Sequence, residues 1–332
     1  MIKQAFLSSE FQRLERFLAT FDLGFDAKDE SFYIEEAGQI IASLSLDGMI
    51  IKGLAIDESY RGMNLAGELV GYAIQILAGK GIYSYHVFTK TKYVEVFQAM
   101  GFRLLADTGK VAFMEGGLGH IESIVTGIRK NFETTFKVDA ALVDIGAIVV
   151  NCNPMTLGHY QLIEQAAKEH DYLIVFVVET DESTFTFKER FSLVYLALKP
   201  ISNILVVAST SYIVSKSTFP SYFLKTLNER EEEHAKLDAM IFRDYFIPLI
   251  PITIRHVGGE TDLVMVAYNR ILKETLKDRL KAIERFTLEG VVISASLVRK
   301  LMYENRIEAA LEYVPVATRA LLRTIMIEKN AK

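Results

Sequence analysis

Hydrophobic and polar positions follow two different patterns along this chain. In residues 1 to about 115, short apolar runs separated by turns predict strands with a few helices. The runs at 40–46 and 49–56 flank Asp47-Gly48, a dipeptide typical of a tight turn, so they predict a hairpin. Between residues 65 and 77, apolar residues recur at steps of three and four, which predicts a helix. A further strand is expected at 83–88.

From residue 147 onward, continuous apolar runs alternate with helical patterns. The predicted order is strand 147–150, helix 158–168, strand 173–178, helix 188–198 and strand 204–207. Buried strands that alternate with helices predict βαβ units, and therefore an α/β fold with a doubly wound parallel sheet covered on both faces.

The densest glycine cluster, at 116–119, marks the expected boundary between the two patterns. We therefore predict a first domain at 1–118, a connector with helical spacing at 119–140 and a second domain at 141–332. A run of charged residues at 229–233 is interpreted as a solvated helix face.

Composition narrows the class of protein. A length of 332 residues favours two domains, and a chain that is 50% hydrophobic and 24% charged is globular. A formal net charge of -5 offers no basic stripe for nucleic acid. The single cysteine, Cys152, excludes a disulfide framework and fits a reducing cytoplasm. Without a ~20-residue apolar run or a secretory leader, a cytoplasmic protein with no membrane or nucleic-acid partner is expected.

The segment that follows the strand at 147–150 carries candidate chemistry. The chain turns through Asn153-Pro154, and a helix begins near Gly158. Ligands of open parallel sheets bind beyond the carboxyl ends of the strands, where helix N-termini favour phosphate. Thr156 and His159 are three residues apart, so both can face that spot and the imidazole can donate to a phosphate oxygen. The ordinary alternative is an N-cap threonine with a polar histidine.

A second segment, at 291–299, has the same construction. A short strand is followed by Ser294 and Ser296, which can cap a helix, and Arg299 lies about one turn inside that helix. A guanidinium at this position can bind two phosphate oxygens at once. The alternative is a capped helix with a surface arginine.

Together, Thr156-Leu157-Gly158-His159 and the segment 293–299 resemble the paired motifs of the HxGH-type nucleotidyltransferases. The resemblance implies a Rossmann-like domain that binds ATP, with Mg²⁺ held by the ATP phosphates rather than by a metal site of the protein. It implies that Thr156, His159 and Arg299 stabilise an in-line attack on the α-phosphorus. The implied ATP contacts are Asn151, Asn153, Pro154, Met155, Thr156, Gly158, His159, Arg190, Ile293, Ser294, Ser296 and Arg299.

In the first domain, a strand ending at Ile56 leads through a loop to a helix. Consecutive N–H groups before a helix suit a pyrophosphate. The loop resembles motif A of the GCN5-related N-acetyltransferases (GNAT), and it departs from that motif at Asn64, where the family has glycine. Asparagine tolerates positive φ, so the bend is expected to survive. The implied contacts with a CoA-like pantetheine arm are Ile56, Arg61, Gly62, Met63, Asn64, Leu65, Ala66 and Gly67. The alternative is a glycine loop with no chemical role.

An acetyltransferase-like domain ahead of an HxGH domain resembles the citrate lyase ligase family, and segments 219–223, 257–260 and 267–269 support this. The resemblance implies acetate, ATP and the thiol of the citrate lyase acyl-carrier (γ) subunit as substrates. That thiol belongs to a CoA-derived prosthetic group, and the products are the acetyl thioester, AMP and diphosphate. Two alternatives stay open: a cofactor-forming adenylyltransferase of the pantetheine-phosphate or NMN type fused to an unrelated N-acetyltransferase, and a non-catalytic module that senses nucleotide or acetyl-CoA. Acetate-dependent release of diphosphate separates them.

Three other residues have side chains capable of acid–base or nucleophilic chemistry. Tyr93 and Glu95 lie where a base could deprotonate the thiol, although surface side chains are the more common reading. A thiol with a pKa near ~8.5 is partly ionised at neutral pH and needs no dedicated base. Cys152 lies beside the nucleotide loop, but a buried packing residue is the more common reading than a covalent nucleophile.

Overall fold

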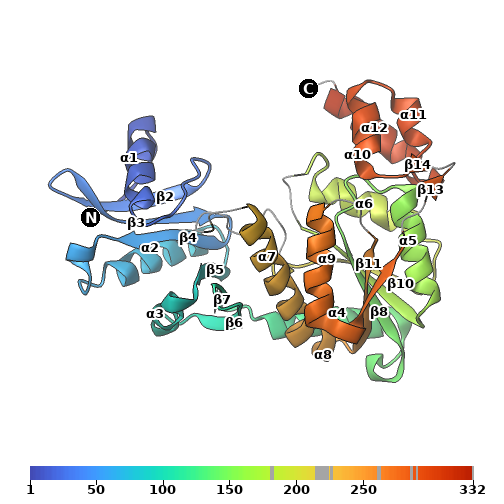
Figure 1. The fold of residues 1–332 in the computed structure, drawn as a ribbon, viewed down its shortest axis with the longest axis horizontal. Helices are drawn as coiled ribbons and strands as arrows, with labels where there is room; N and C mark the ends of the chain where they lie inside the picture. The colour runs from blue at the N-terminus through green and yellow to red at the C-terminus, as the bar shows by residue number, and fades with distance from the viewer. Residues whose placement is uncertain are drawn as a thin grey trace. The chain divides into compact units, whose positions relative to one another are not determined.

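The computed structural model describes residues 1–179, 183–213, 224, 227–259, 263–284, 287–288 and 291–330. The chain divides into two compact units (Figure 1). Unit 1 contains residues 1–120 and 219–237, and unit 2 contains residues 121–218 and 238–332. Helix α7 (Leu227–Ile241) contributes residues to both units. Among the described helices, none is long and apolar enough to cross a membrane.

Unit 1 is built on a seven-stranded mixed sheet with the strand order β1-β2-β3-β4-β5-β7-β6. Its strands are β1 (Ile2–Gln4), β2 (Glu30–Glu36), β3 (Gln39–Asp47), β4 (Ile50–Ile56), β5 (Ser84–Lys90), β6 (Arg103–Asp107) and β7 (Val111–Gly117). Its helices before α7 are α1 (Ser8–Ala19), α2 (Leu65–Gly79) and α3 (Val94–Ala99), with short 3-10 turns η1 (Glu58–Tyr60) and η2 (Thr91–Tyr93).

The core of unit 1 lies between the sheet and α2. Alternate strand residues such as Phe32, Leu44 and Ile51 pack with Leu69 and Ala73 of the helix. This is the arrangement expected when a period-two apolar strand face meets a helical stripe. The predicted hairpin is confirmed as the antiparallel pair β3 and β4, and the predicted helix and strand are confirmed as α2 and β5.

Strands β4 and β5 are parallel neighbours that pair over a short stretch. The ladder consists of Ile50 opposite His86 and Ile51 opposite Val87. Beyond Ile51, β4 pairs only with β3 within the described part of the chain, so main-chain groups of residues 52–56 lack a strand partner on the β5 side. The two strands therefore part toward their carboxyl ends, where β4 runs into the loop before α2.

Unit 2 is built on a five-stranded sheet in which every ladder is parallel. The strand order is β10-β9-β8-β11-β12, with β8 (Ile145–Val150), β9 (Tyr172–Val177), β10 (Ile204–Ala208), β11 (Ile252–Gly258) and β12 (Leu280–Ile283). The chain proceeds outward from β8 to β10, then returns to the other side of β8 for β11 and β12. This order is doubly wound, with its switch point between β8 and β11, which confirms the predicted α/β class.

Helices cover the parallel sheet and form a cluster at the C-terminal end of the chain (Figure 1). They are α4 (Ile121–Phe136), α5 (Leu157–Lys168), α6 (Phe187–Leu198), α8 (Ile247–Leu249), α9 (Leu263–Leu276), α10 (Ala295–Tyr303), α11 (Ile307–Leu311) and α12 (Arg319–Asn330). Shorter elements are the 3-10 turns η3 (Ala140–Leu142), η5 (Lys277–Arg279) and η6 (Val316–Thr318), the π-helical turn η4 (Phe242–Phe246), and the hairpin of β13 (Thr287–Leu288) and β14 (Val291–Val292).

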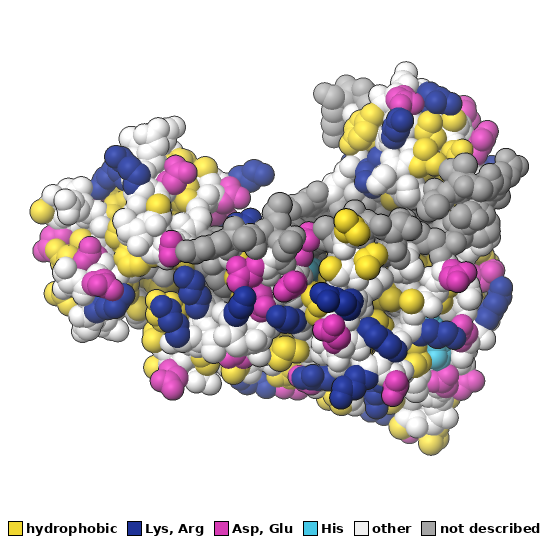
Figure 2. All heavy atoms as spheres, viewed as in Figure 1, with side chains coloured by type: hydrophobic (Ala, Val, Ile, Leu, Met, Phe, Trp, Pro, Cys, Tyr) yellow, Lys and Arg dark blue, Asp and Glu magenta, His cyan; other side chains and the backbone are white. Residues whose placement is uncertain are grey.

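The interpretation of residues 229–233 as a solvated face is wrong. Glu233 is 1% exposed, and its carboxylate accepts hydrogen bonds from the Thr108 hydroxyl and from Lys236 Nζ. Glu229 pairs with Lys110 Nζ at 2.7 Å. A buried carboxylate needs such partners, and sequence position alone did not reveal them. Elsewhere the charge is spread: on the face shown in Figure 2, Lys and Arg side chains are interspersed with Asp and Glu in both units.

Candidate functional site

The loop that joins β8 to α5 is braced by its own helix cap. Thr156 is the N-cap residue of α5, and its Oγ1 accepts a hydrogen bond from His159 N at 3.3 Å. The main-chain N–H of Thr156 donates in return to His159 Nδ1 at 3.2 Å. Because Nδ1 accepts a backbone hydrogen bond, the neutral ring carries its proton on Nε2. The cap therefore fixes both the orientation and the tautomer of the half-buried imidazole.

The second predicted segment lies against this loop. Arg299 NH1 donates to the carbonyl oxygen of Asn153, and its NH2 donates to Ser296 Oγ at 3.1 Å. Ser294 is the N-cap residue of α10, with its hydroxyl accepting from Leu297 N at 3.2 Å. The two segments, more than 130 residues apart in the chain, thus meet at the carboxyl edge of the sheet.

Gly158 lies close against the chain ahead of α10. A Cβ at this position would lie 2.7 Å from the carbonyl oxygen of Ile293, closer than real Cβ contacts allow. The first turn of α5 can therefore approach the chain ahead of α10 only because residue 158 has no side chain. The adjacent helix N-termini present a positive dipole end and main-chain N–H donors, which suit the phosphates of a nucleotide.

Arg190 is placed differently from the other predicted ATP contacts. The side chain, in the first turn of α6, is fully buried. Its Nε donates to the carbonyl of Phe185 at 3.1 Å, and NH1 donates to the carbonyls of Asn151 and Val178, both at 2.9 Å. The guanidinium thus ties together the chain ends that leave β8 and β9. Direct contact between Arg190 and ATP stays a prediction, whereas its contact with the loop backbone is part of the structure.

The remaining predicted residues of this loop are buried or form a hydrogen bond to the chain just before α6. Pro154 and Met155 are buried, and Asn153 Oδ1 accepts from Phe185 N at 3.0 Å. Cys152 is 1% exposed, and burial raises the pKa of its thiol to about 12. A thiol that stays neutral in the folded protein is a poor nucleophile, so the geometry favours the packing role.

Two residues near this edge were not predicted. Glu179 is the second residue after β9, near the same edge of the sheet as Asn151 after β8, and its N–H donates to Ser209 Oγ at 3.2 Å. The rule that placed Asn151 at a strand end would also have found Glu179. The carbonyl of Tyr313 accepts from Leu157 N at 2.9 Å, which links the start of α5 to the C-terminal helices. No local pattern around Tyr313 indicates that contact.

The loop between β4 and α2 in unit 1 is held mainly by local contacts. Arg61 is paired with Glu58 at 2.9 Å, and both side chains are exposed. Gly62 has φ +88° and Asn64 has φ +58°, so the expectation that asparagine keeps the left-handed bend is confirmed. Asn64 Oδ1 lies 2.6 Å from where a Cβ of Gly67 would be, so Gly67 leaves room for that side chain over the first turn of α2.

The other predicted contacts of this loop surround its exit into α2. Ile56 ends β4, Met63 is 61% exposed, and Leu65 and Ala66 lie half-buried in the first helical turn. The loop opens where β4 and β5 part, so its N–H groups and the unpaired edge of β4 lie at the same end of the strands.

The two candidate bases for the thiol lie on exposed surface after β5. Tyr93 is 41% exposed, with Lys92 Nζ over its ring at 4.9 Å, and Glu95 is exposed in α3. Neither position distinguishes a base from an ordinary surface side chain.

Of the three supporting segments, part lies outside the described residues: 219–223 and residue 260. In the described part, Asn269 Nδ2 donates to the carbonyl of Gly258 at 3.0 Å, which joins α9 to the end of β11.

Two family models match successive parts of the chain. The model of the acetyltransferase (GNAT) family matches residues 3–102, and the model of the citrate lyase ligase C-terminal domain matches residues 145–322. A solved acetyltransferase of the GNAT family from Staphylococcus aureus is 14% identical, covering 36% of this chain and 100% of that chain with a TM-score of 0.30.

Curated relatives align with the chain almost from end to end. The [citrate [pro-3S]-lyase] ligase of Haemophilus influenzae is 32% identical over 95% of this chain and 92% of that protein. The protein of the same name from Escherichia coli is 32% identical over 96% of this chain and 92% of its own length. With this coverage across both units, the chain belongs to the citrate lyase ligase family and is an enzyme of the ligase class.

Proposed function

We propose that this enzyme uses ATP and acetate to acetylate the prosthetic-group thiol of the citrate lyase acyl-carrier subunit. The observation that carries the proposal is the meeting of the β8–α5 loop with the start of α10. Arg299 bonds to the carbonyl of Asn153, and Gly158 lies against the carbonyl of Ile293. The cap of α5, with its oriented imidazole, thereby faces the same edge as an arginine from a distant helix.

In the first step, an acetate oxygen attacks the α-phosphorus of ATP, the bond to the β-phosphate oxygen breaks, and diphosphate leaves. Acetate needs this activation because oxide cannot leave from a carboxylate, whereas AMP leaves readily from the acetyl adenylate. His159 Nε2–H and the guanidinium of Arg299 would donate to phosphate oxygens that gain charge. Two of the five donors of Arg299 bond to described protein acceptors, so others remain for phosphate.

Other groups at this edge would position the catalytic side chains or the Mg²⁺ ion and would not take part in bond making or breaking. Thr156 would act through His159, since its main-chain N–H and its hydroxyl both contact Nδ1 of the ring and orient it. Arg190 would position the loop ends of β8 and β9, because its donors serve main-chain carbonyls. Mg²⁺ bound to the ATP phosphates would neutralise charge on the leaving diphosphate, and Glu179, two residues after β9, is a carboxylate of the type that Mg²⁺ accepts.

In the second step, the carrier thiol attacks the acetyl carbon, its proton passes to solvent, and AMP leaves. The loop of unit 1 would bind the CoA-derived arm through main-chain N–H groups before α2 and through Arg61. The edge of β4 that lacks a strand partner can pair with amide groups of an extended arm, as β-augmentation does. An ATP-consuming reaction on a free thiol suits a reducing compartment, so we place the enzyme in the cytoplasm.

A panel of short carboxylates tests the first step on the full chain. Each is supplied with ATP, Mg²⁺ and labelled diphosphate, and the exchange of label into ATP is measured without the carrier. We expect exchange that depends on acetate. Exchange without any carboxylate, or with nicotinamide mononucleotide or phosphopantetheine instead, would support the cofactor-forming alternative, which the family does not favour.

The carrier protein tests the second step. AMP formation and the acetyl thioester should rise together when the thiol form of the carrier is added. A chain that binds ATP or acetyl-CoA but forms neither product would be a sensing module. Cys152→Ser should keep full activity, because a covalent acyl-enzyme on a buried neutral thiol is not part of the proposed route.

A further inference from the structure

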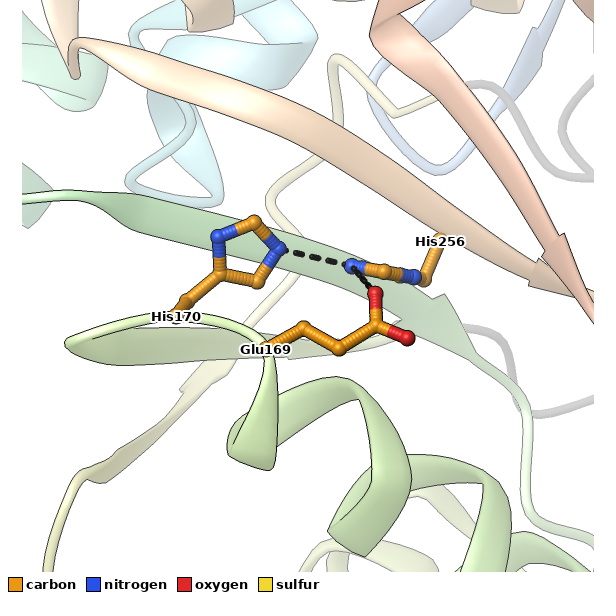
Figure 3. A group of neighbouring side chains, drawn as sticks. All are labelled: Glu169, His170 and His256. Atoms are coloured by element: carbon orange, nitrogen blue, oxygen red, sulfur yellow. Dashed lines mark hydrogen bonds and ion pairs between the residues drawn. The ribbon is translucent and has the colours of Figure 1, made fainter.

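A cluster of three side chains near the amino-terminal edge of the unit 2 sheet has no role in the reaction proposed above. Glu169 is the C-cap residue of α5, His170 lies in the turn before β9, and His256 is on β11 (Figure 3). His170 Nε2 and His256 Nε2 are 2.8 Å apart, and His256 Nε2 lies 3.9 Å from Glu169 Oε2. One ligand atom from each residue falls within 4.8 Å of the others.

The fold makes room for this cluster at a specific place. Gly146 is inside the buried strand β8, where glycine weakens a strand because it has no side chain to pack. A Cβ at residue 146 would lie 2.3 Å from His170 Cδ2. The imidazole of His170 therefore occupies the space that any other residue at 146 would fill.

A carboxylate behind His170 sets its tautomer. Asp144 Oδ2 lies 2.7 Å from His170 Nδ1 and accepts a hydrogen bond from its N–H, while Asp144 Oδ1 accepts from the Thr253 hydroxyl. With the proton on Nδ1, the lone pair of His170 Nε2 points toward His256. This carboxylate–histidine arrangement is the one that supports metal-bound imidazoles in proteins.

His256 is fully buried, and its Nδ1 has no hydrogen-bond partner among the described residues. When Nδ1 holds the proton, Nε2 of His256 presents a second lone pair to the same point as Nε2 of His170. Two imidazole nitrogens and one carboxylate oxygen form a ligand set that Zn²⁺ accepts, with water as a fourth ligand. Tetrahedral Zn–N bonds of 2.0–2.1 Å separate two nitrogens by about 3.3 Å, so the rings need to part by about 0.5 Å.

Lys281 is the one charge that opposes a cation here among the described neighbours of Glu169. Its Nζ is 2.8 Å from Glu169 Oε2, and the side chain is 53% exposed. A long exposed lysine can turn its ammonium into solvent when a cation takes the carboxylate. Lys281 and the metal ion would therefore compete for the Glu169 carboxylate. Removing the lysine should then tighten metal binding, which would not happen if the three side chains formed only a structural hydrogen-bond network.

We propose that Glu169, His170 and His256 bind a divalent transition cation of the zinc class. The ion would join the turn between α5 and β9 to β11. Because Asp144 and His170 precede their strands while the nucleotide loop follows β8, the cation would stabilise unit 2 without taking part in adenylation.

The test uses the full chain, freed of metal with a chelator and returned to chelator-free buffer. Zn²⁺ is titrated by calorimetry, and Co²⁺ is used as a spectroscopic probe. We expect one saturable equivalent, visible Co²⁺ absorption of tetrahedral intensity, and a higher melting temperature with Zn²⁺.

Three variants on the rim of the cluster sharpen the test. Glu169→Gln should weaken Zn²⁺ binding about 10-fold or more, and Asp144→Asn should weaken it by about 10- to 100-fold, as outer-shell partners do. Lys281→Met should tighten binding, because it removes the competing ammonium. His120→Gln, in an exposed histidine of unit 1, is the matched control and should bind Zn²⁺ as the parent does.

Acetate-dependent exchange of diphosphate into ATP reports whether each variant is folded, and all four should retain it. The proposal is overturned if the parent takes up no saturable equivalent. It is also overturned if folded Glu169→Gln and Lys281→Met bind Zn²⁺ as the parent does, since uptake would then be adventitious.

Discussion

Two loops of this protein have the same construction, a strand that ends and a helix that begins, yet they differ in how they are held. The loop after β8 in unit 2 is largely buried and receives side chains from distant elements, Arg190 of α6 and Arg299 of α10. The loop after β4 in unit 1 is exposed from Arg61 to Asn64 and is held by nearby groups such as Glu58.

The difference follows from what each loop is proposed to do. Stabilising charge on a phosphate requires donors fixed before the reaction, since reorganising them during it adds to the barrier. Binding a flexible arm through main-chain N–H groups requires the right backbone bend and little else. The first loop should therefore be sensitive to changes far away in the sequence, and the second only to changes within it.

The largest effect is expected for the imidazole of His159, in the first turn of α5. His159→Ala removes a fixed donor and should lower acetate-dependent adenylation by ~10²–10³, or about 3 to 4 kcal/mol in the barrier. Arg299→Ala should be comparably severe. The measurement is exchange of diphosphate into ATP, with Arg16→Glu, an exposed change on α1, as control. Nearly full exchange by His159→Ala would show that the site is wrongly placed.

Removing the Arg190 guanidinium, which bonds to the main chain of the loop after β8, should lower the stability of the protein as well as the rate of adenylation. Arg190→Met deletes donors to three main-chain carbonyls, those of Phe185, Asn151 and Val178, which should lower the free energy of unfolding by about 3 kcal/mol. Denaturant unfolding measures this, and Arg61→Met, in the exposed loop, is the matched change. Equal stability of the two variants would contradict the contrast between the loops.

Two glycines are needed for different reasons: Gly158 because another segment lies close to it, and Gly62 because its φ is positive. Gly158→Ala places a Cβ 2.7 Å from the Ile293 carbonyl, so the two segments must move apart, and about 1 to 3 kcal/mol of stability and most adenylation should be lost. Gly62→Ala meets no atom within 4 Å and strains only φ, at about 1 kcal/mol. It should raise the KM for the carrier and leave exchange unchanged. Loss of exchange in Gly62→Ala would show that the unit 1 loop is needed for adenylation, which would contradict the proposed division between the two loops.

The smallest effect is expected for the exposed arginine of the second loop. Arg61→Glu reverses a charge proposed to meet the pyrophosphate of the arm, and solvent screening limits its contribution to below about 1 kcal/mol. The KM for the carrier should rise a few-fold at low salt, and less at high salt. An unchanged KM at both salt concentrations would remove Arg61 from the arm contacts.

Part of the fold could be predicted because the relevant signals are local. The helix over 121–136 and the strand that ends at Val150 follow from apolar periodicity, and the caps formed by Thr156 and Ser294 follow from residue type and position. The left-handed bend at Asn64 was likewise expected from the conformational freedom of asparagine. Each of these depends on a few neighbouring residues.

Other features could not be predicted, because they join residues that are distant in sequence. The buried Glu233 depends on Thr108, and the pair of His170 and His256 bridges 86 residues. Arg190 was predicted as an ATP contact from the family resemblance, and only the packing of α6 against the ends of β8 and β9 gave it main-chain acceptors.

By itself, the sequence determined many of the segments that become strands and helices and where α5 and α10 begin, because propensity and capping act within a turn or two. The tertiary structure alone decided which of those helix starts lie together and which charged side chains lose their water. Those outcomes depend on long-range packing, in which the same arginine or glutamate is a surface group or a buried brace according to what the fold places beside it.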